Sequence, residues 1–269
     1  MKAMFAKTVS AKSIGESERH TMYGLMQQYY ECMAWDRFNK DLDDKDDVIL
    51  LMDKETGTIK GFSTLKNIEI KIGKSKAFGV FSGDTVVDRA FWGQRVLGKA
   101  FLRYLFLQKA RRPFTPFYWI LISKGYKTYL LLANNFSEHY PRYEQETPRD
   151  AQSLMDRFAN SLFGDAYNGD TGLIHFKESL GQLREGIADV PTGTSFQNPR
   201  IAYFAKQNPT WADGSELMCI ARMTWSMPLY YVCKSWWKLM ARPFLKRAAL
   251  KSNPFLRHGV CRCYRTNLS

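Results

Sequence analysis

The segment Val86–Phe101 carries the residue types that bind a phosphate group. Small residues at Gly93, Gly98 and Ala100 let a ligand approach the backbone closely. Cationic side chains that can donate charge-assisted hydrogen bonds lie among them, at Arg89, Arg95 and Lys99. The alternative is a plain strand-to-helix turn, in which glycine supplies the geometry and arginine the solubility. The chemistry of the segment therefore depends on the elements that hold it.

A strand and a helix are expected on either side of this segment. Ala77–Val87 is typical of a strand that Gly83 interrupts. After the segment, apolar residues on one helical face predict a helix that ends near Arg111–Pro113, namely Leu97, Ala100, Phe101, Tyr104, Leu105 and Gln108. A strand, a tight loop and a helix N-terminus together make an anion site that suits a phosphate or pyrophosphate.

The rest of the chain alternates between helical and extended patterns. Residues 17–42 have helical spacing, and Val48–Met52 and Thr58–Leu65 flank a Gly-containing turn, which predicts a β-hairpin. Phe117–Ile122 predicts a buried strand, and Thr128–Leu132 is helical or extended. Further elements are expected as helices at Asp150–Phe163, Phe176–Ile187 and Ile201–Ala205 and a strand at Leu217–Ile220.

The loop segment resembles the acyl-CoA pyrophosphate loop of the GNAT (N-acetyltransferase) superfamily. The pattern of that loop begins with Gln or Arg, has Gly three positions later, and has Gly or Ala two positions after that Gly. Arg95, Gly98 and Ala100 match each defined position. The order of helices, hairpin, long strand, loop, helix and buried strand is also similar, over roughly residues 15–145. The resemblance implies an α/β fold with a mixed sheet: a GNAT-like acyltransferase core at 1–145, followed by a helical, basic C-terminal extension at 146–269. That extension would be a substrate lobe or a docking surface, or would pack with the core as one unit.

The same resemblance assigns a thioester co-substrate and its binding residues. Acyl-CoA or an acyl carrier thioester would be bound by its phosphates at the loop and helix start, through Arg95, Val96, Leu97, Gly98, Lys99 and Ala100. The pantetheine arm would pair with the strand end at Val86 and Val87. Such enzymes transfer the acyl group directly to an amine, which here would be a small molecule, without a covalent enzyme intermediate.

Direct transfer needs a base for the ammonium and an acid for the leaving thiolate. Asp84 and Asp88, late on the central strand, are the candidate bases, and Tyr140 or Tyr143 is the candidate acid. The alternative for each carboxylate is a solvated or hydrogen-bonded side chain at a strand end. The resemblance weakens after Asn134, because Pro141 would disturb a helix there.

The net charge of +13 is concentrated in two blocks. Residues 89–137 contain nine basic and no acidic side chains, and residues 217–269 contain ten and none. The first block surrounds the phosphate loop. In the second block, from Trp225 to Arg265, Trp, Tyr and Phe alternate with Lys and Arg. This pattern fits a peripheral helix on an anionic membrane, a docking site for an acidic carrier protein, or a final helix packed on the domain. Nucleic acid is disfavoured because no reader motif accompanies the charge.

Composition excludes several other classes of protein. The 269 residues are 45% apolar, so the chain is neither disordered nor fibrous. Five cysteines, no apolar leader and no charge-free run longer than 11 residues favour a cytoplasmic location, with peripheral membrane contact as an option. The four histidines share no ligand spacing with the cysteines, so no metal is expected.

Two functions follow from the sequence. The first is an N-acyltransferase that moves an acyl group from acyl-CoA or a carrier-protein thioester to an amine. The alternative is a non-enzymatic, GNAT-shaped protein that docks on an anionic membrane or an acidic partner through its basic aromatic tail.

Overall fold

A nine-stranded mixed sheet organises most of the chain in the computed structural model, which describes residues 3–31, 33–176, 182–183 and 195–227, and a second sheet there has two strands. The strands are β1 (Met4–Ser10), β2 (Tyr30–Glu31), β3 (Asp47–Asp53), β4 (Ile59–Ile72), β5 (Ser75–Val87), β6 (Phe117–Ser123), β7 (His139–Tyr140), β8 (Tyr167–Asn168), β9 (Leu173–Ile174), β10 (Gln182–Leu183) and β11 (Glu216–Arg222). The helices are α1 (Glu16–Gln27), α2 (Trp35–Asp43), α3 (Val96–Arg111), α4 (Tyr126–Asn135), α5 (Arg149–Phe163) and α6 (Pro199–Gln207). Short 3-10 turns are η1 (Ala11–Ser13), η2 (Arg89–Phe91), η3 (Gly164–Ala166), η4 (Ser195–Gln197) and η5 (Trp211–Asp213).

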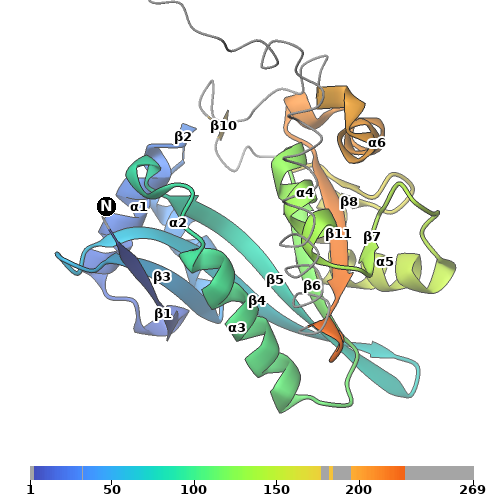
Figure 1. Cartoon of the computed structure of the whole chain (residues 1–269), viewed down its shortest axis with the longest axis horizontal. Coiled ribbons are helices and arrows are strands. Elements are labelled where there is room, and N and C mark those ends of the chain that lie inside the picture. The colour runs from blue at the N-terminus through green and yellow to red at the C-terminus, as the bar shows by residue number, and fades with distance from the viewer. Residues whose placement is uncertain (1–2, 32, 177–181, 184–194, 228–269) are drawn as a thin grey trace, which may run out of the picture. The chain divides into compact units, whose positions relative to one another are not determined.

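The strand order of the sheet is β1-β3-β4-β5-β6-β11-β9-β8, and β7 also pairs with β11 (Figure 1). Within the described residues, β5 and β6 are the parallel neighbours of this sheet, and its other pairs are antiparallel. The parallel pair needs a crossover connection, which α3 supplies. This order confirms the expected mixed α/β sheet.

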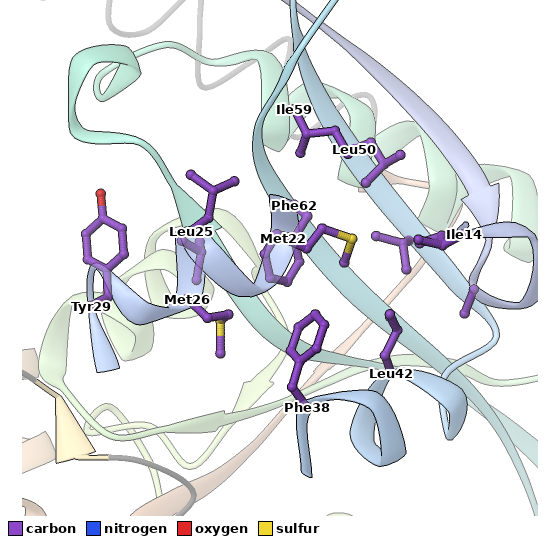
Figure 2. Close-up of a cluster of buried hydrophobic side chains, with 13 residues drawn as sticks. Ile14, Met22, Leu25, Met26, Tyr29, Phe38, Leu42, Leu50, Ile59 and Phe62 are labelled. Carbon is purple, nitrogen blue, oxygen red and sulfur yellow. The ribbon is translucent and has the colours of Figure 1, made fainter. Parts of the chain in front are cut away.

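Helices α1 and α2 cover one face of the N-terminal half of the sheet. Alternate residues of β3 point to opposite faces, so Val48 and Leu50 pack with these helices. Figure 2 shows side chains of α1, α2 and β4 converging in this cluster, among them Met22, Phe38 and Phe62. Helix α3 lies on the opposite face, where the Tyr104 hydroxyl donates to Asp47 of β3 at 2.6 Å.

Helix α5 packs on the sheet around the parallel pair. Its Phe158 is fully buried beside Ile120 of β6 and Gly79 of β5. A Cβ at position 79 would lie 2.4 Å from Ile120 Cδ1 and 2.9 Å from Phe158 Cε1, so this contact requires glycine. The close packing anchors β5 to β6 at this level of the sheet.

Most expected elements form, and two expectations need correction. The prediction of one helical stretch over residues 17–42 is wrong in its middle, because α1 ends at Gln27 and β2 intervenes before α2 begins at Trp35. The expected helix at Phe176–Ile187 lies mostly outside the described residues, and where it is described it forms strand β10 instead, paired with β2. The sequence patterns also missed the edge strand β1 and the two-residue strands β7, β8 and β9.

Residues on both sides of position 145 share this sheet. Strand β11 pairs with β6 over six residues, Leu217 to Arg222, and the compact unit extends from Met1 to Met223. A second unit, Thr224–Ser269, is described only at Thr224–Met227, where the Met227 amide donates to the Thr224 carbonyl at 3.2 Å. The division into 1–145 and 146–269 stays a prediction. No helix among the described residues is both long enough and apolar enough to cross a membrane.

Candidate functional site

The parallel strands β5 and β6 separate at their carboxyl ends. Residues Phe78–Phe81 of β5 pair with Phe117–Ile120 of β6, whereas β5 continues to Val87 and β6 to Ser123. On its other side β5 stays paired with β4 up to Val87, opposite Gly61. Within the part of the chain that the structure describes, no strand pairs with the edge of β5 that faces β6 from Ser82 to Val87. The edge therefore offers backbone groups to an extended ligand.

A β-bulge in β5 lies next to this opening. Ser63 pairs with Thr85 and Leu65 with Ser82, so that Thr64 alone faces both Gly83 and Asp84. A Cβ at Gly83 would come within 2.6 Å of the Thr64 hydroxyl oxygen, which explains the glycine that interrupts the expected strand. The bulge places Asp84, a predicted base, at the point where the two strands separate.

A second carboxylate, Glu216, belongs to the same end of the sheet. It is the first residue of β11, and the next residue, Leu217, pairs with Ser123 at the end of β6. Burial raises the pKa of Glu216 to about 7, a shift that Lys124 opposes and the nearby carboxylate of Asp84 increases. Glu216 is therefore divided between its acid and base forms near neutral pH.

Asp84 has a corresponding environment. Burial raises the pKa of its carboxyl, Lys45 and Lys124 lower it, and Asp41 adds to the increase. Burial also raises the pKa of the Tyr30 hydroxyl, and the charges of Asp84 and Glu216 raise it further. The strand ends thus bring together two carboxylates with raised pKa values and a tyrosine that keeps its proton.

The loop between β5 and α3 is held against the end of α1. The Val87 carbonyl accepts hydrogen bonds from the Tyr29 hydroxyl at 2.8 Å and from the Trp92 indole at 2.7 Å. The two rings stack with centroids 6.3 Å apart, and the Arg89 guanidinium lies 5.9 Å from each centroid. Asp88, the second predicted base, caps η2 by accepting from the Ala90 amide at 2.9 Å. These contacts fix the path of the loop toward α3.

The first turn of α3 has the features of an anion site. Its first intrahelical bond runs from the Lys99 amide to the Arg95 carbonyl at 3.1 Å, so the preceding amides, Val96 to Gly98, have no acceptor within the helix. No side chain of the N-cap residue Arg95 caps them, and the turn contains no acidic residue. Apart from its chain neighbours and the backbone of α3, no atom of the described residues lies within 4 Å of a Cβ built at Gly98, so the space over this turn is open.

The structure places the other predicted binding residues in two settings. Arg95 and Lys99 are exposed and Ala100 is half-buried, all beside the first turn of α3. Val86 is buried, and its carbonyl oxygen lies 2.7 Å from a Cβ built on Gly61, which directs its backbone toward β4. The amide and carbonyl of Val87 point the other way, toward the open edge, because backbone direction alternates along a strand.

The predicted acids lie farther from the carboxylates. Tyr140 is on β7, which pairs with β11, so β11 and β6 separate it from β5. It lines a hollow of about 440 Å³ together with Tyr118, Glu138 and Arg222. Tyr143 follows the Tyr140–Pro141 bond and is exposed. The structure does not bring either tyrosine to the end of the sheet that carries Asp84.

Sequence patterns missed Glu216, Lys124 and Tyr30. Glu216 precedes an apolar run that predicts a strand, but only the pairing of β11 with β6 places it near Asp84. Among the described residues, no group of three or more His, Cys, Asp or Glu side chains is arranged to hold a metal ion. The predicted tail site at Trp225–Arg265 lies outside the described residues beyond Met227, and its docking role stays a prediction.

Comparisons with known proteins give matches in structure only. No protein-family model matches the chain, and no curated protein matches it in sequence. A probable N-acyltransferase from Enterococcus faecalis V583 matches 51% of this chain and 33% of its own, with 14% identity and a TM-score of 0.38. Glucosamine-6-phosphate N-acetyltransferase from Arabidopsis thaliana matches 43% of this chain and 80% of its own (17% identity, TM-score 0.32).

The GNAT family N-acetyltransferase YhbS from Escherichia coli, solved with CoA, matches 51% of this chain and 70% of its own, with 13% identity and a TM-score of 0.33. Superpositions with these scores do not assign an activity. The function proposed next therefore rests on the geometry of this chain.

Proposed function

We propose that the protein is an N-acyltransferase that moves an acyl group from a CoA or carrier-protein thioester directly to a small-molecule amine. One observation carries the proposal: an open strand edge, an uncapped helix N-terminus and two carboxylates with raised pKa values occur at the same end of the parallel pair β5 and β6. Anion binding and proton removal are the two tasks that this reaction sets.

The thioester donor would lie along the open edge of β5. Its phosphates fit the free amides of Val96, Leu97 and Gly98, because an uncapped first turn attracts anions and Arg95 and Lys99 add positive charge. The extended arm would pair with the backbone of β5 at Thr85 and at the Val87 amide. The Val87 carbonyl already accepts two hydrogen bonds, and the backbone of Val86 faces β4.

The reaction removes two protons from the acceptor ammonium and delivers one of them to the donor sulfur. Glu216, directly or through one water, would take the proton from the ammonium of the acceptor. The neutral amine then attacks the thioester carbonyl carbon, so that a C–N bond forms and the C–S bond breaks. Asp84 would assist by attracting the ammonium. Asp88 is less well placed, because its carboxylate caps η2.

The leaving thiolate takes up the second proton. Tyr30 is better placed than Tyr140 or Tyr143 to guide this proton from nitrogen to sulfur, because Tyr30 interacts electrostatically with both Asp84 and Glu216. Its raised pKa keeps its hydroxyl protonated, so it would act through a hydrogen bond without ionising. The described cysteine, Cys219, is fully buried, and burial raises the pKa of its thiol. It is therefore unsuited to form an acyl-enzyme, which supports direct transfer.

Thiol release tests the proposal. Acetyl, octanoyl and palmitoyl groups would be supplied on CoA and on an acyl carrier protein, each with a panel of primary amines. The active pair identifies both the donor type and the acceptor. Glu216→Gln should lower the turnover number by about 10²–10⁴, which is the usual contribution of a general base. Glu55→Gln, on an exposed turn, is the matched control. Thiol release that is equal in Glu216→Gln and wild type would remove Glu216 from the mechanism.

A further inference from the structure

Phe114 is held in water at the end of the sheet opposite the candidate site. Its side chain is 97% exposed, in the loop that joins α3 to β6. A large apolar side chain that remains fully solvated forgoes the stabilisation that burial would give. A single exposed apolar side chain is common on protein surfaces, so its meaning depends on the residues around it.

Lys109 maintains the conformation of this loop. Its ammonium is buried and donates to the carbonyl of Pro113 at 3.0 Å and to that of Thr115 at 2.8 Å. These two carbonyls flank Phe114 on either side. Burial lowers the pKa of Lys109, and the two hydrogen bonds to carbonyl oxygens offset part of the cost of burying its charge. These two hydrogen bonds restrain the backbone on both sides of Phe114.

Arg112 adds a second restraint. Its guanidinium lies 3.7 Å from the ring centroid of Phe78, the β5 residue that pairs with Phe117 at the start of β6. It also donates to the Gln108 side chain at 2.9 Å. The loop that carries Phe114 is therefore attached to both α3 and β5.

The tip of the β4–β5 hairpin lies at the same end of the sheet. Ile72, which is 39% exposed, precedes the turn at Gly73 and Lys74, and Lys71 and Lys74 are both exposed. The hairpin carboxylate Glu69 is paired with Lys76 at 2.6 Å. The Arg157 side chain of α5 donates to the Lys71 carbonyl at 3.2 Å and adds another cation. Figure 1 shows the hairpin tip and the C-terminal end of α3 at one end of the strands.

We propose that this end of the protein docks on an anionic membrane surface. The Phe114 end, defined as Lys71, Ile72, Lys74, Arg111 and Phe114, combines two exposed apolar side chains with three exposed cations. Apolar side chains that enter the interfacial region and cations that face lipid phosphates are the two contributions to peripheral membrane binding. These residues are different from those of the basic tail that the sequence pointed to.

The Phe114 end and the candidate site lie at opposite ends of β5, which restricts the acceptor of the proposed reaction. Strand β5 runs from Ser75, next to the hairpin tip, to Val87 at the candidate site, and its 13 residues span roughly 40 Å. A protein docked through the Phe114 end would hold the thioester and acceptor site away from the lipid. The acceptor would then be a water-soluble amine, not a lipid headgroup in the same membrane.

Vesicle binding by the full-length chain tests this surface. Wild type should cosediment with vesicles of phosphatidylcholine and phosphatidylglycerol, and more weakly with phosphatidylcholine alone or at high salt. The variant Phe114→Ser/Ile72→Ser should bind about tenfold more weakly, as expected for the loss of one to two partly inserted apolar side chains. Leu131→Ser, at an exposed residue of α4, is the matched control and should bind like wild type.

A crosslinking readout locates the contact even if another segment also binds lipid. p-Benzoylphenylalanine in place of Phe114 should form lipid adducts on irradiation with the same vesicles. In place of Phe196, which is also exposed, it should not. Unchanged binding of Phe114→Ser/Ile72→Ser, an equal loss in the control, or an absence of lipid adducts at position 114 would each overturn the proposal.

Discussion

Replacing Glu216 by Gln should stabilise the fold at pH 8 while it lowers transfer activity. Burial raises the pKa of the Glu216 carboxyl to about 7, from an ordinary value of 4.5. Below pH 4.5 the side chain is protonated in both the folded and unfolded states, so its charge costs nothing. Between these two values the native state binds more protons than the unfolded state, so stability falls as pH rises. Above pH 7 the carboxylate is ionised in the fold, and the full cost is present.

The size of the effect follows from the shift. A difference of about 2.5 pKa units corresponds to an upper limit of about 3 kcal/mol. Glutamine has nearly the same shape and no charge, so Glu216→Gln should recover up to this amount at pH 8 and almost nothing at pH 4. For a domain of this size the gain is equivalent to several degrees in Tm. The same change removes the proposed base, so a gain in stability and a loss of activity should occur together.

Thermal unfolding of both proteins across pH 4–9 measures the difference directly and requires no substrate. Glu55→Gln, whose side chain lies on the exposed turn between β3 and β4, controls for the loss of one negative charge. Its Tm difference from wild type should not vary through pH 7. If Glu216→Gln is no more stable than wild type at pH 8, then Glu216 is not the buried carboxylate with a raised pKa that the mechanism requires.

Two further predictions concern the packing that supports the site. Gly79→Ala should lower the free energy of unfolding by about 1–3 kcal/mol in chemical denaturation, because its Cβ would overlap Ile120 and Phe158. Adding Ile120→Val to this variant should restore part of the lost stability. Equal stability of Gly79→Ala and wild type would contradict this packing. His139 is buried and its Nδ1 lies 2.9 Å from the Phe136 carbonyl oxygen, and burial lowers its pKa to about 4. Between pH 4 and 6.5 the native state therefore binds fewer protons than the unfolded state, so up to about 3 kcal/mol of stability is lost as pH falls through this range. His139→Asn should remove this pH dependence of the free energy of unfolding measured by denaturation. An unchanged pH dependence in the variant would refute the prediction.

Local patterns were sufficient to predict the elements on either side of the loop in Val86–Phe101. The hairpin of β3 and β4, the interruption of β5 at Gly83, helix α3 and the buried strand β6 each have a signal within a few residues. The break between α1 and α2 had none, because the helical spacing continues through Tyr29 and Tyr30. Only the folded chain shows that the Tyr29 hydroxyl bonds to Val87 and so belongs to the loop and not to a longer helix.

The residues of the proposed acid–base site were only partly predictable from the sequence. Asp84 could be selected because it lies near the end of a predicted strand beside the loop. Glu216 is remote in the chain and becomes its neighbour only through the pairing of β11 with β6. Tyr140 and Tyr143 are predicted from their position after β6, but β7 pairs with β11, so that β11 and β6 lie between Tyr140 and β5. Long-range strand order decides which side chains meet, and a linear pattern does not contain it.

Binding of a CoA thioester at the first turn of α3 is the central claim, and Gly98→Trp tests it most directly. Apart from its chain neighbours and the backbone of α3, no atom of the described residues lies within 4 Å of a Cβ at position 98, so the variant should fold, and the indole would fill the space assigned to the phosphates. Gly24→Trp, in the equally open middle of α1, is the matched control. Wild type and Gly24→Trp should gain about 2.7 kcal/mol of stability at a thioester concentration of 100 Kd, seen as a rise in Tm, and Gly98→Trp should show no rise. An equal rise in Gly98→Trp, or no rise in wild type with any acyl-CoA or acyl-carrier thioester, would contradict the account.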